Sequence, residues 1–332
     1  MLRAAYWSAI PLPLPSLKHL RASPSAFEQR RALLLALAAQ FAASLLAHSA
    51  AVAQARPIIT RPVPSSGVAL PVVGLGSWIT FNVGNDRGAR DMCAEVMRNF
   101  FAAGGRLIDS SPMYGSAQEV IGYGLSKFDK IMGQVFAADK VWISSAARGP
   151  GQIETSRQHW NVPHFDLLQV HNLLSWQEHL PMLLAMKAAR RVRYVGITTS
   201  EGRRHREFEQ VMASQPLDFV QVTYNIVDRE VEQRILPLAL DRRIGVLINR
   251  PFRQGELIRT LNRHPLPGWV AEIDCTNWAQ FLLKFIVSHP AVTCAIPATS
   301  SVAHVLENMG AAYGRLPDEP MRRRMVAYVE KL

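Results

Sequence analysis

An acid and a phenol stand close together in the segment LIDSSPMYG, which covers residues 107–115. Asp109 ends a short apolar run, and Tyr114 follows a turn that contains a proline. A phenol has a pKa of about 10 in water, so it donates a proton near neutral pH only beside a cation or a strong hydrogen-bonding partner. The pair therefore predicts a site of proton transfer, provided that the fold places such a partner beside Tyr114.

Strands and helices must alternate to position these two residues. Short apolar runs alternate with amphipathic stretches from about residue 70 onward, which predicts a parallel sheet. Strands are expected at 72–75, 106–108, 141–145, 166–170, 192–197, 219–222, 245–248 and 292–296, each followed by a helix. Eight such pairs over roughly 260 residues have the size of a closed (β/α)8 barrel, also called a TIM barrel.

An open doubly wound sheet is the alternative fold. It requires a glycine-rich fingerprint directly after the first strand, and the segment GLGSW over 74–78 lacks the third glycine and the following helix. We therefore expect a single α/β domain, an eight-stranded parallel barrel, over residues 70–315, followed by a C-terminal helix within 316–332.

Polar residues follow several of the expected strands. Asp109 follows the second strand, His171 the fourth, Gln221 lies in the sixth, and Thr299 follows the eighth. This set, in this order, resembles the aldo-keto reductases, and the resemblance covers residues 70–315. It implies hydride transfer from NAD(P)H to an aldehyde or ketone, with Tyr114 as proton donor and His171 orienting the carbonyl oxygen. Taken singly, each residue also has a structural explanation as a turn cap, a packing aromatic or a core histidine.

The resemblance further implies a lysine on the third strand, paired with Asp109 and lowering the pKa of Tyr114. With that strand at 141–145, the lysine position is Ala146, and Lys140 would lie at the opposite end of the barrel. Arg148 is a nearby cation that could reach toward Asp109. The sequence therefore predicts an impaired reductase, and the alternative is a catalytically weak or inactive NADP-binding or sensing protein on the same barrel.

The resemblance also implies a dinucleotide site and a substrate mouth. Tyr224 would stack on the nicotinamide ring, and Arg250 would lie near the pyrophosphate. NADP(H) is favoured over NAD(H) by the habit of the family, although Ser301 stands where NADP-preferring members often carry a lysine or arginine. The full set of implied cofactor contacts is Thr198, Thr199, Gln221, Tyr224, Arg250, Pro251, Phe252, Thr299, Ser300, Glu307 and Asn308. The implied substrate-lining residues are Trp78, Met113 and Trp142, which suit a small carbonyl compound with an apolar body.

Composition and residue spacing argue against nucleic-acid binding, a metal site and a disulfide framework. The chain has 332 residues, is 48% hydrophobic and carries a formal net charge of +11. Its basic residues form no run interleaved with aromatics, so nucleic acid is not an expected partner. The histidines at 159, 164 and 171 lack the spacing of metal ligands, so we expect no metal site. The three cysteines, Cys93, Cys275 and Cys294, are widely scattered and are expected to be buried and unpaired.

The first 55 residues are typical of a targeting segment. Arg30 and Arg31 precede an apolar run over 32–47, and the segment AQA over 53–55 has the small residues of a cleavage site. The run is short and alanine-rich for a membrane span. The paired arginines favour a twin-arginine (Tat) signal peptide and a periplasmic location. The alternative is a misassigned start and a cytoplasmic protein.

Overall fold

The computed structural model describes residues 57–128 and 133–332. The predicted targeting segment over 1–55 lies outside the described residues, so export stays a prediction. Among the helices in the described part of the chain, none is long and apolar enough to cross a membrane.

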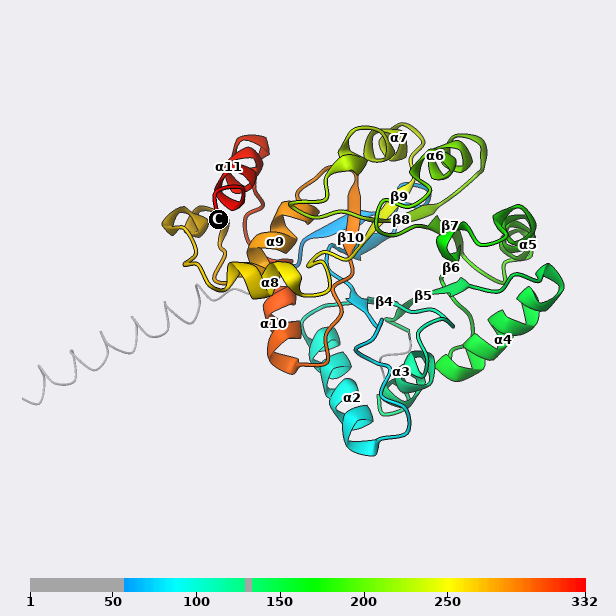
Figure 1. Cartoon of the computed structure of the whole chain (residues 1–332). Coiled ribbons are helices and arrows are strands. Elements are labelled where there is room, and N and C mark those ends of the chain that lie inside the picture. Colours follow the sequence, from blue (N-terminus) through cyan, green and yellow to red (C-terminus); the bar gives the residue numbers. More distant parts are fainter. Residues whose placement is uncertain (1–56, 129–132) are drawn as a thin grey trace, which may run out of the picture. The chain divides into compact units, whose positions relative to one another are not determined.

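Eight parallel strands form one sheet, and their order in space follows their order in the chain (Figure 1). The strands are β3 (Leu75–Gly76), β4 (Leu107–Asp109), β5 (Phe136–Val141), β6 (Leu167–Val170), β7 (Tyr194–Thr198), β8 (Phe219–Thr223), β9 (Gly245–Asn249) and β10 (Val292–Ala295). The first and last strands also meet, because Val73 bridges to Ala295 and Gly76 bridges to Ala298 in parallel register. The predicted (β/α)8 barrel is thus confirmed.

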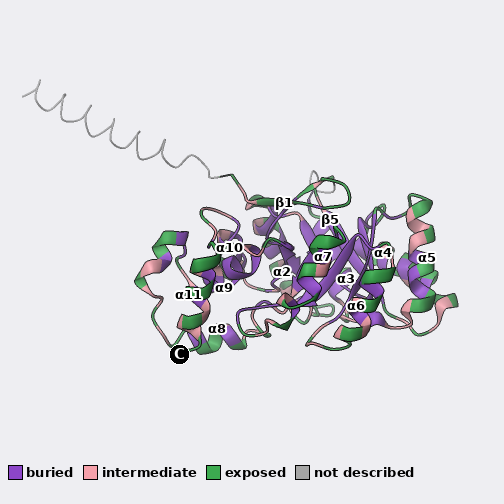
Figure 2. Ribbon diagram, turned by 90° about the horizontal axis from the view of Figure 1, so that it is seen from above, coloured by how far each residue is buried: buried purple, intermediate pink, exposed green. Residues whose placement is uncertain are grey.

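Helices connect the strands and cover the sheet on its outer side (Figures 1 and 2). The α-helices are α2 (Arg87–Ala102), α3 (Ala117–Leu125), α4 (Gly149–Trp160), α5 (Trp176–Ala188), α6 (His205–Ser214), α7 (Ile235–Asp241), α8 (Glu256–Leu261), α9 (Trp278–Val287), α10 (Val302–Gly310) and α11 (Glu319–Val329). Short 3-10 helices are η1 (Ala146–Arg148), η2 (His171–Leu173), η3 (Glu230–Glu232) and η4 (Gly268–Ile273). Figure 2 shows the strands buried and the outer helix faces exposed, as the amphipathic patterns predict.

The barrel is preceded by a hairpin, which the sequence patterns did not indicate. β1 (Thr60–Pro62) pairs antiparallel with β2 (Ala69–Pro71). Its side chains Val63 and Leu70 are fully buried and belong to the same apolar cluster as Leu107 and Phe136. These two residues lie near the N-terminal ends of β4 and β5, so the hairpin packs against the end of the barrel opposite the candidate site.

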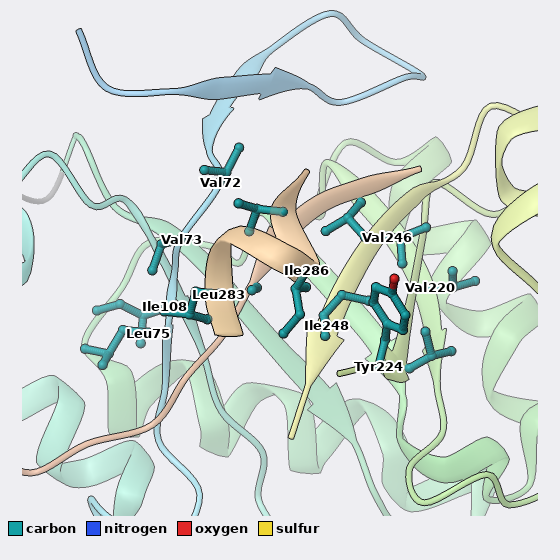
Figure 3. Packing of buried hydrophobic residues seen from close by; sticks show 14 of the residues in the cluster. Val72, Val73, Leu75, Ile108, Val220, Tyr224, Val246, Ile248, Leu283 and Ile286 are labelled. Carbon is teal, nitrogen blue, oxygen red and sulfur yellow. The ribbon is translucent and has the colours of Figure 1, made fainter. Parts of the chain in front are cut away.

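Alternation of side chains along the strands divides the apolar residues into two clusters. One cluster lies inside the barrel and consists of Val63, Leu70, Leu107, Phe136, Ala138, Leu167, Tyr194, Phe219, Leu247, Cys294 and Ile296. The other lies between the outer face of the strands and the helices, and Figure 3 shows Ile248 of β9 beside Ile286 of α9. The three cysteines are buried and free, as predicted.

The third strand of the barrel begins and ends earlier than predicted. It spans Phe136–Val141, whereas the sequence indicated 141–145. The backbone of Trp142 is bonded by a side chain instead of a neighbouring strand, since its N–H donates to Gln152 Oε1 at 2.7 Å and its carbonyl accepts from Gln152 Nε2 at 2.9 Å. The strand therefore stops at Val141, although Val, Trp and Ile have high β-propensity.

Candidate active site

A buried ion pair lies at the C-terminal end of the barrel interior. Lys140 Nζ is 2.6 Å from Asp109 Oδ2, and both side chains are almost fully buried. Nζ also donates to the carbonyl oxygen of Ser110 at 2.7 Å. Lys140 points inward because it lies on the same face of β5 as Phe136 and Ala138, which belong to the inner cluster. Register places it beside Gln169 of the next strand.

Two glutamines satisfy the second oxygen of the same carboxylate. Gln221 Nε2 donates to Asp109 Oδ1 at 2.9 Å, and Gln169 Nε2 donates to it at 3.3 Å. With Lys140 on Oδ2, Asp109 accepts hydrogen bonds on both oxygens while buried. This is the environment that a buried charge pair requires, because desolvation is otherwise not offset. Gln221 is thus held to Asp109, and its carbonyl oxygen is 3.5 Å from Asn249 Nδ2.

Tyr114 lies directly beside this ion pair. Lys140 Nζ is 5.2 Å from the centroid of the Tyr114 ring. Burial raises the pKa of the phenol, the ammonium of Lys140 opposes that rise, and the charge of Asp109 adds to it. Burial also disfavours the charged form of Lys140, but Asp109 and Tyr114 outweigh this and hold the pKa of the lysine above its usual value. Lys140 is therefore a permanent cation at neutral pH.

His171 completes the cluster from the end of β6. Its ring lies edge-on to that of Tyr114, with the centroids 5.7 Å apart. Burial, and then the charge of Lys140, place the pKa of His171 well below its usual range, so the ring is neutral at pH 7. Its Nδ1 is 2.7 Å from Ser111 Oγ. The backbone N–H of Met113 donates to the same Oγ at 3.2 Å.

These contacts define the tautomer of His171. A serine hydroxyl has one donor and two acceptor sites. Ser111 is fully buried, and among the described residues His171 Nδ1 is the acceptor available to its proton. The hydroxyl therefore donates to Nδ1, and the ring proton resides on Nε2. This places a second hydrogen-bond donor near Tyr114.

The structure corrects the predicted loss of the lysine. Lys140, predicted at the opposite end of the barrel, is the partner of Asp109, whereas Ala146 lies in η1 after the strand has ended. Arg148 is exposed in the same 3-10 helix, and the cation beside Asp109 is Lys140. The misplaced strand boundary caused the error, since Lys140 becomes an inward-facing residue when β5 begins at Phe136.

Tyr224 does not have the orientation that stacking on a nicotinamide would require. Phe219, Gln221 and Thr223 take one face of β8, so Tyr224 takes the other, outside the barrel. Figure 3 shows it among outward-facing core residues. Its hydroxyl accepts from Arg322 of α11 at 2.6 Å, and the side chain is fully buried. Tyr224 is a core residue that ties the last helix to the barrel.

The other predicted carboxamide contacts lie at the correct end of the barrel, with their hydroxyls engaged. Thr198 Oγ1 accepts from the backbone N–H of Asn172 at 2.9 Å. The Thr199 hydroxyl donates to the carbonyl of Arg203. Both are buried at the end of β7.

The predicted pyrophosphate loop follows β9 at the same edge. Arg250 Nη1 is 2.6 Å from Glu201 Oε1, and its guanidinium lies 6.0 Å from the centroid of the Trp78 ring. Arg253 pairs with Asp228 at 3.2 Å. Pro251 is buried and Phe252 packs against the core. The loop thus brings two guanidinium groups to the barrel rim.

The fourth part of the predicted cofactor site is the start of α10. Thr299 is buried, and Ser300 is exposed just before the helix. Ser301 caps the helix by accepting from the N–H of His304. In α10 itself, Glu307 is exposed and Asn308 is buried. An exposed hydroxyl before a helix N-terminus is suited to an anionic group.

The predicted mouth residues come from three loops at this end. The rings of Trp142 and His171 are 6.4 Å apart, and Trp142 is 40% exposed. Met113 follows Ser111 in the loop after β4, and Trp78 follows β3. Sequence reasoning missed Lys140, Gln169 and Ser111. Gln169 and Lys140 could have been found from strand alternation, because polar residues at inward positions of a barrel need a reason.

Known proteins resemble this chain in sequence. A model of the aldo/keto reductase family matches residues 72–325. The NADH-specific methylglyoxal reductase of Escherichia coli (strain K12) is 25% identical over 241 residues, which are 62% of this chain and 71% of that protein. Aldo-keto reductase YhdN of Bacillus subtilis (strain 168) is 27% identical over 213 residues, 59% of this chain and 62% of that protein.

Solved structures share the fold. An aldo/keto reductase from Klebsiella pneumoniae, in complex with NADP and acetate, superposes with a TM-score of 0.67 at 24% identity, covering 79% of this chain and 92% of that chain. The holo form of the Bacillus halodurans aldo-keto reductase AKR11C1 gives a TM-score of 0.67 at 18% identity, covering 82% and 96%. With the family model matching most of its length, the chain belongs to the aldo/keto reductase family.

Proposed function

We propose that the protein is an NAD(P)H-dependent oxidoreductase that reduces an aldehyde or ketone to an alcohol, with Tyr114 as the proton donor. The observation that carries this proposal is the buried Lys140, which lies between the Asp109 carboxylate at 2.6 Å and the Tyr114 ring at 5.2 Å. A cation beside a phenol stabilises the phenolate that forms as the proton leaves. Lys140 is thus the cation that the sequence analysis required beside Tyr114.

Each residue of the cluster has a distinct task. Tyr114 gives its proton to the carbonyl oxygen, and Lys140 stabilises the charge left on the phenol. Asp109 fixes Lys140 in place. His171 is neutral and carries its proton on Nε2, so it can donate a hydrogen bond to the same carbonyl oxygen and orient it. The lowered pKa of His171 suits a neutral hydrogen-bond donor at pH 7, and among the charges that act on Tyr114 that of Lys140 lowers the pKa of the phenol.

The residues at the barrel rim fit a nicotinamide dinucleotide. Arg250 and Arg253 offer charge to a pyrophosphate, and Ser300 offers a hydroxyl at the start of α10. When bound, the reduced dinucleotide supplies the hydride that the carbonyl carbon accepts. Tyr224 is not part of this proposal. NADP(H) remains the favoured cofactor by family habit, while the similar E. coli protein is described as NADH-specific.

The test starts with binding. Titrating the protein with NADPH and with NADH, monitored by nucleotide fluorescence, should give saturable binding of at least one. Adding methylglyoxal, the aldehyde named for the E. coli relative, should then oxidise the bound nucleotide. Binding of neither nucleotide would overturn the proposal.

The variant Tyr114→Phe tests the proton donor. It should bind the nucleotide as wild type does and reduce the aldehyde roughly 10²–10⁴-fold more slowly, which is the contribution of a positioned acid. A turnover within a few-fold of wild type would show that Tyr114 is not the donor.

A further inference from the structure

A second carboxylate lies directly behind the catalytic lysine. Asp139 precedes Lys140 on β5, and alternation turns its side chain outward, between the sheet and helices α3 and α4. It is fully buried. Its Oδ1 accepts from the backbone N–H of Lys140 at 2.7 Å, and its Oδ2 accepts from Gln118 Nε2 at 2.7 Å. Gln118 Nε2 donates to Ser156 Oγ at 2.9 Å as well.

Among the described residues, the neighbours of Asp139 offer it hydrogen bonds but no direct ion pair. Across its strand, register pairs it with Leu168 of β6. From α3 the uncharged Gln118 donates to Asp139, and from α4 the uncharged Ser156 accepts from Gln118. The titratable groups that act on it are Lys140 and Asp109, and Tyr114 responds to its charge. Within the described residues, Lys140 is the one cation of this cluster, and its ammonium contacts Asp109.

We propose that Asp139 is a titratable positioning residue, which tunes proton donation by Tyr114 through Lys140. When Asp139 is protonated, the lysine faces one carboxylate, Asp109, and acts fully on the phenol. When Asp139 is ionised, one cation faces two carboxylates. The added negative charge makes loss of the Tyr114 proton less favourable.

The titration falls in the working range of an enzyme. Burial raises the pKa of Asp139 to about 7, against the opposing effects of the Lys140 backbone hydrogen bond, the Lys140 charge and Gln118. As pH rises through that value, Asp139 loses its proton and the pKa of Tyr114 rises further. The rate of carbonyl reduction should therefore decrease across an inflection near pH 7, well before Tyr114 itself ionises.

The first experiment rests on the proposed function and measures kcat for aldehyde reduction from pH 5.5 to 9 with saturating nucleotide. Asp139→Asn keeps the shape without the charge, because the Gln118 amide can rotate to accept from the new amide. It should abolish the inflection and raise kcat at pH 8.5 by roughly three- to tenfold over wild type. An unchanged inflection in Asp139→Asn would overturn the proposal.

Two further variants separate this role from a structural one. Gln118→Met removes a hydrogen bond that favours the carboxylate, so it should move the inflection upward by about one pH unit. Asp166→Asn is the matched control, because Asp166, directly before β6, is a buried carboxyl that accepts from the N–H of Ala137 of β5 at 2.9 Å. It should keep the wild-type inflection. No movement with Gln118→Met, or a lost inflection in Asp166→Asn, would contradict the assignment.

A second measurement does not depend on activity. The unfolded chain ionises Asp139 near pH 4 and the native chain near pH 7, so the native state binds more protons between these values. Wild-type stability should decrease, relative to Asp139→Asn, as pH rises from about 4 to 7 and then level off. Chemical denaturation midpoints over this range measure it. Parallel curves would overturn the titration of Asp139, whereas an inactive wild type would overturn the proposed function instead.

Discussion

Ser111 connects the loop that carries Tyr114 to the ring of His171. Its hydroxyl accepts from the N–H of Met113 and donates to His171 Nδ1, which leaves the ring proton on Nε2. Through this contact the hydroxyl determines which nitrogen of the ring can donate a hydrogen bond. His171 is neutral because of its burial and the charge of Lys140. Only one of its ring nitrogens therefore carries a proton, and the tautomer decides which one can donate a hydrogen bond.

We expect Ser111→Ala to lower kcat roughly tenfold with nucleotide affinity unchanged, because Nδ1 loses the donor that selects the Nε2–H tautomer. Steady-state kinetics and nucleotide titration measure the two quantities. Thr293→Ala is the control, since Thr293 is a buried hydroxyl that accepts from the N–H of Val246 at 3.1 Å, at the start of β10. Equal losses in both variants would indicate a general effect on stability, contrary to the role given to Ser111.

At the same scale, three residues of the site were predicted from the sequence, whereas Lys140, Gln169 and Ser111 were missed. Asp109, Tyr114 and His171 stand beside strand ends that apolar runs define clearly, and the structure gathers them with Lys140. Lys140 was misjudged because a charged pair, Asp139 and Lys140, looks like a strand boundary. Both side chains are buried here, Lys140 inside the barrel and Asp139 outside it. The carboxylate that pairs with Lys140, Asp109, lies on another strand, so the pattern of one strand does not reveal the ion pair.

Among the elements, β5 and β8 show how much depends on strand phase. Shifting β5 by five residues moved the lysine from the site to the far end of the barrel. On β8, Gln221 was correctly placed at the site, but Tyr224 belongs to the opposite face by simple alternation. Its partner Arg322 lies 98 positions away in α11, so no local pattern around Tyr224 indicates the contact.

Two loops at the rim are joined by an ion pair at the proposed pyrophosphate site. Glu201, after β7, holds Arg250, after β9, at 2.6 Å, and also pairs with Arg203. An arginine engaged by a carboxylate is less available to a pyrophosphate. The charge of the loop that we propose to bind the pyrophosphate is thus partly neutralised by the loop after β7.

We expect Glu201→Gln to tighten nucleotide binding roughly three- to tenfold at low ionic strength, with the gain shrinking as salt is added. Fluorescence titration at two salt concentrations provides the measurement. Glu209→Gln is a matched control, because Glu209 pairs with Arg234 at 2.6 Å in a contact between α6 and the segment before α7. Weaker binding by Glu201→Gln would show that the ion pair instead holds the site in its binding shape.

For the whole molecule, the alternation of eight strands and helices was sufficient to predict the barrel. The hairpin β1–β2 escaped prediction because its strands are three residues long and rich in proline, with a pattern too short to show a period. Its residues Val63 and Leu70 are buried by contact with the barrel, so their role cannot be inferred from the hairpin sequence alone. Fold class follows from repetition, whereas such additions depend on contacts between distant segments.

The barrel gathers Asp109, Lys140, Tyr114 and His171 from separate strands and loops, and in the proposed reaction proton donation depends most on Lys140. The decisive measurement is the single-turnover rate at which bound NAD(P)H is oxidised by an activated aldehyde, for wild type, Lys140→Met and Ala146→Lys. Circular dichroism and nucleotide affinity confirm that each variant is folded. We predict a rate roughly 10²–10⁴-fold lower for Lys140→Met and an unchanged rate for Ala146→Lys. A near-wild-type rate in Lys140→Met, or a marked gain in Ala146→Lys, would contradict the account.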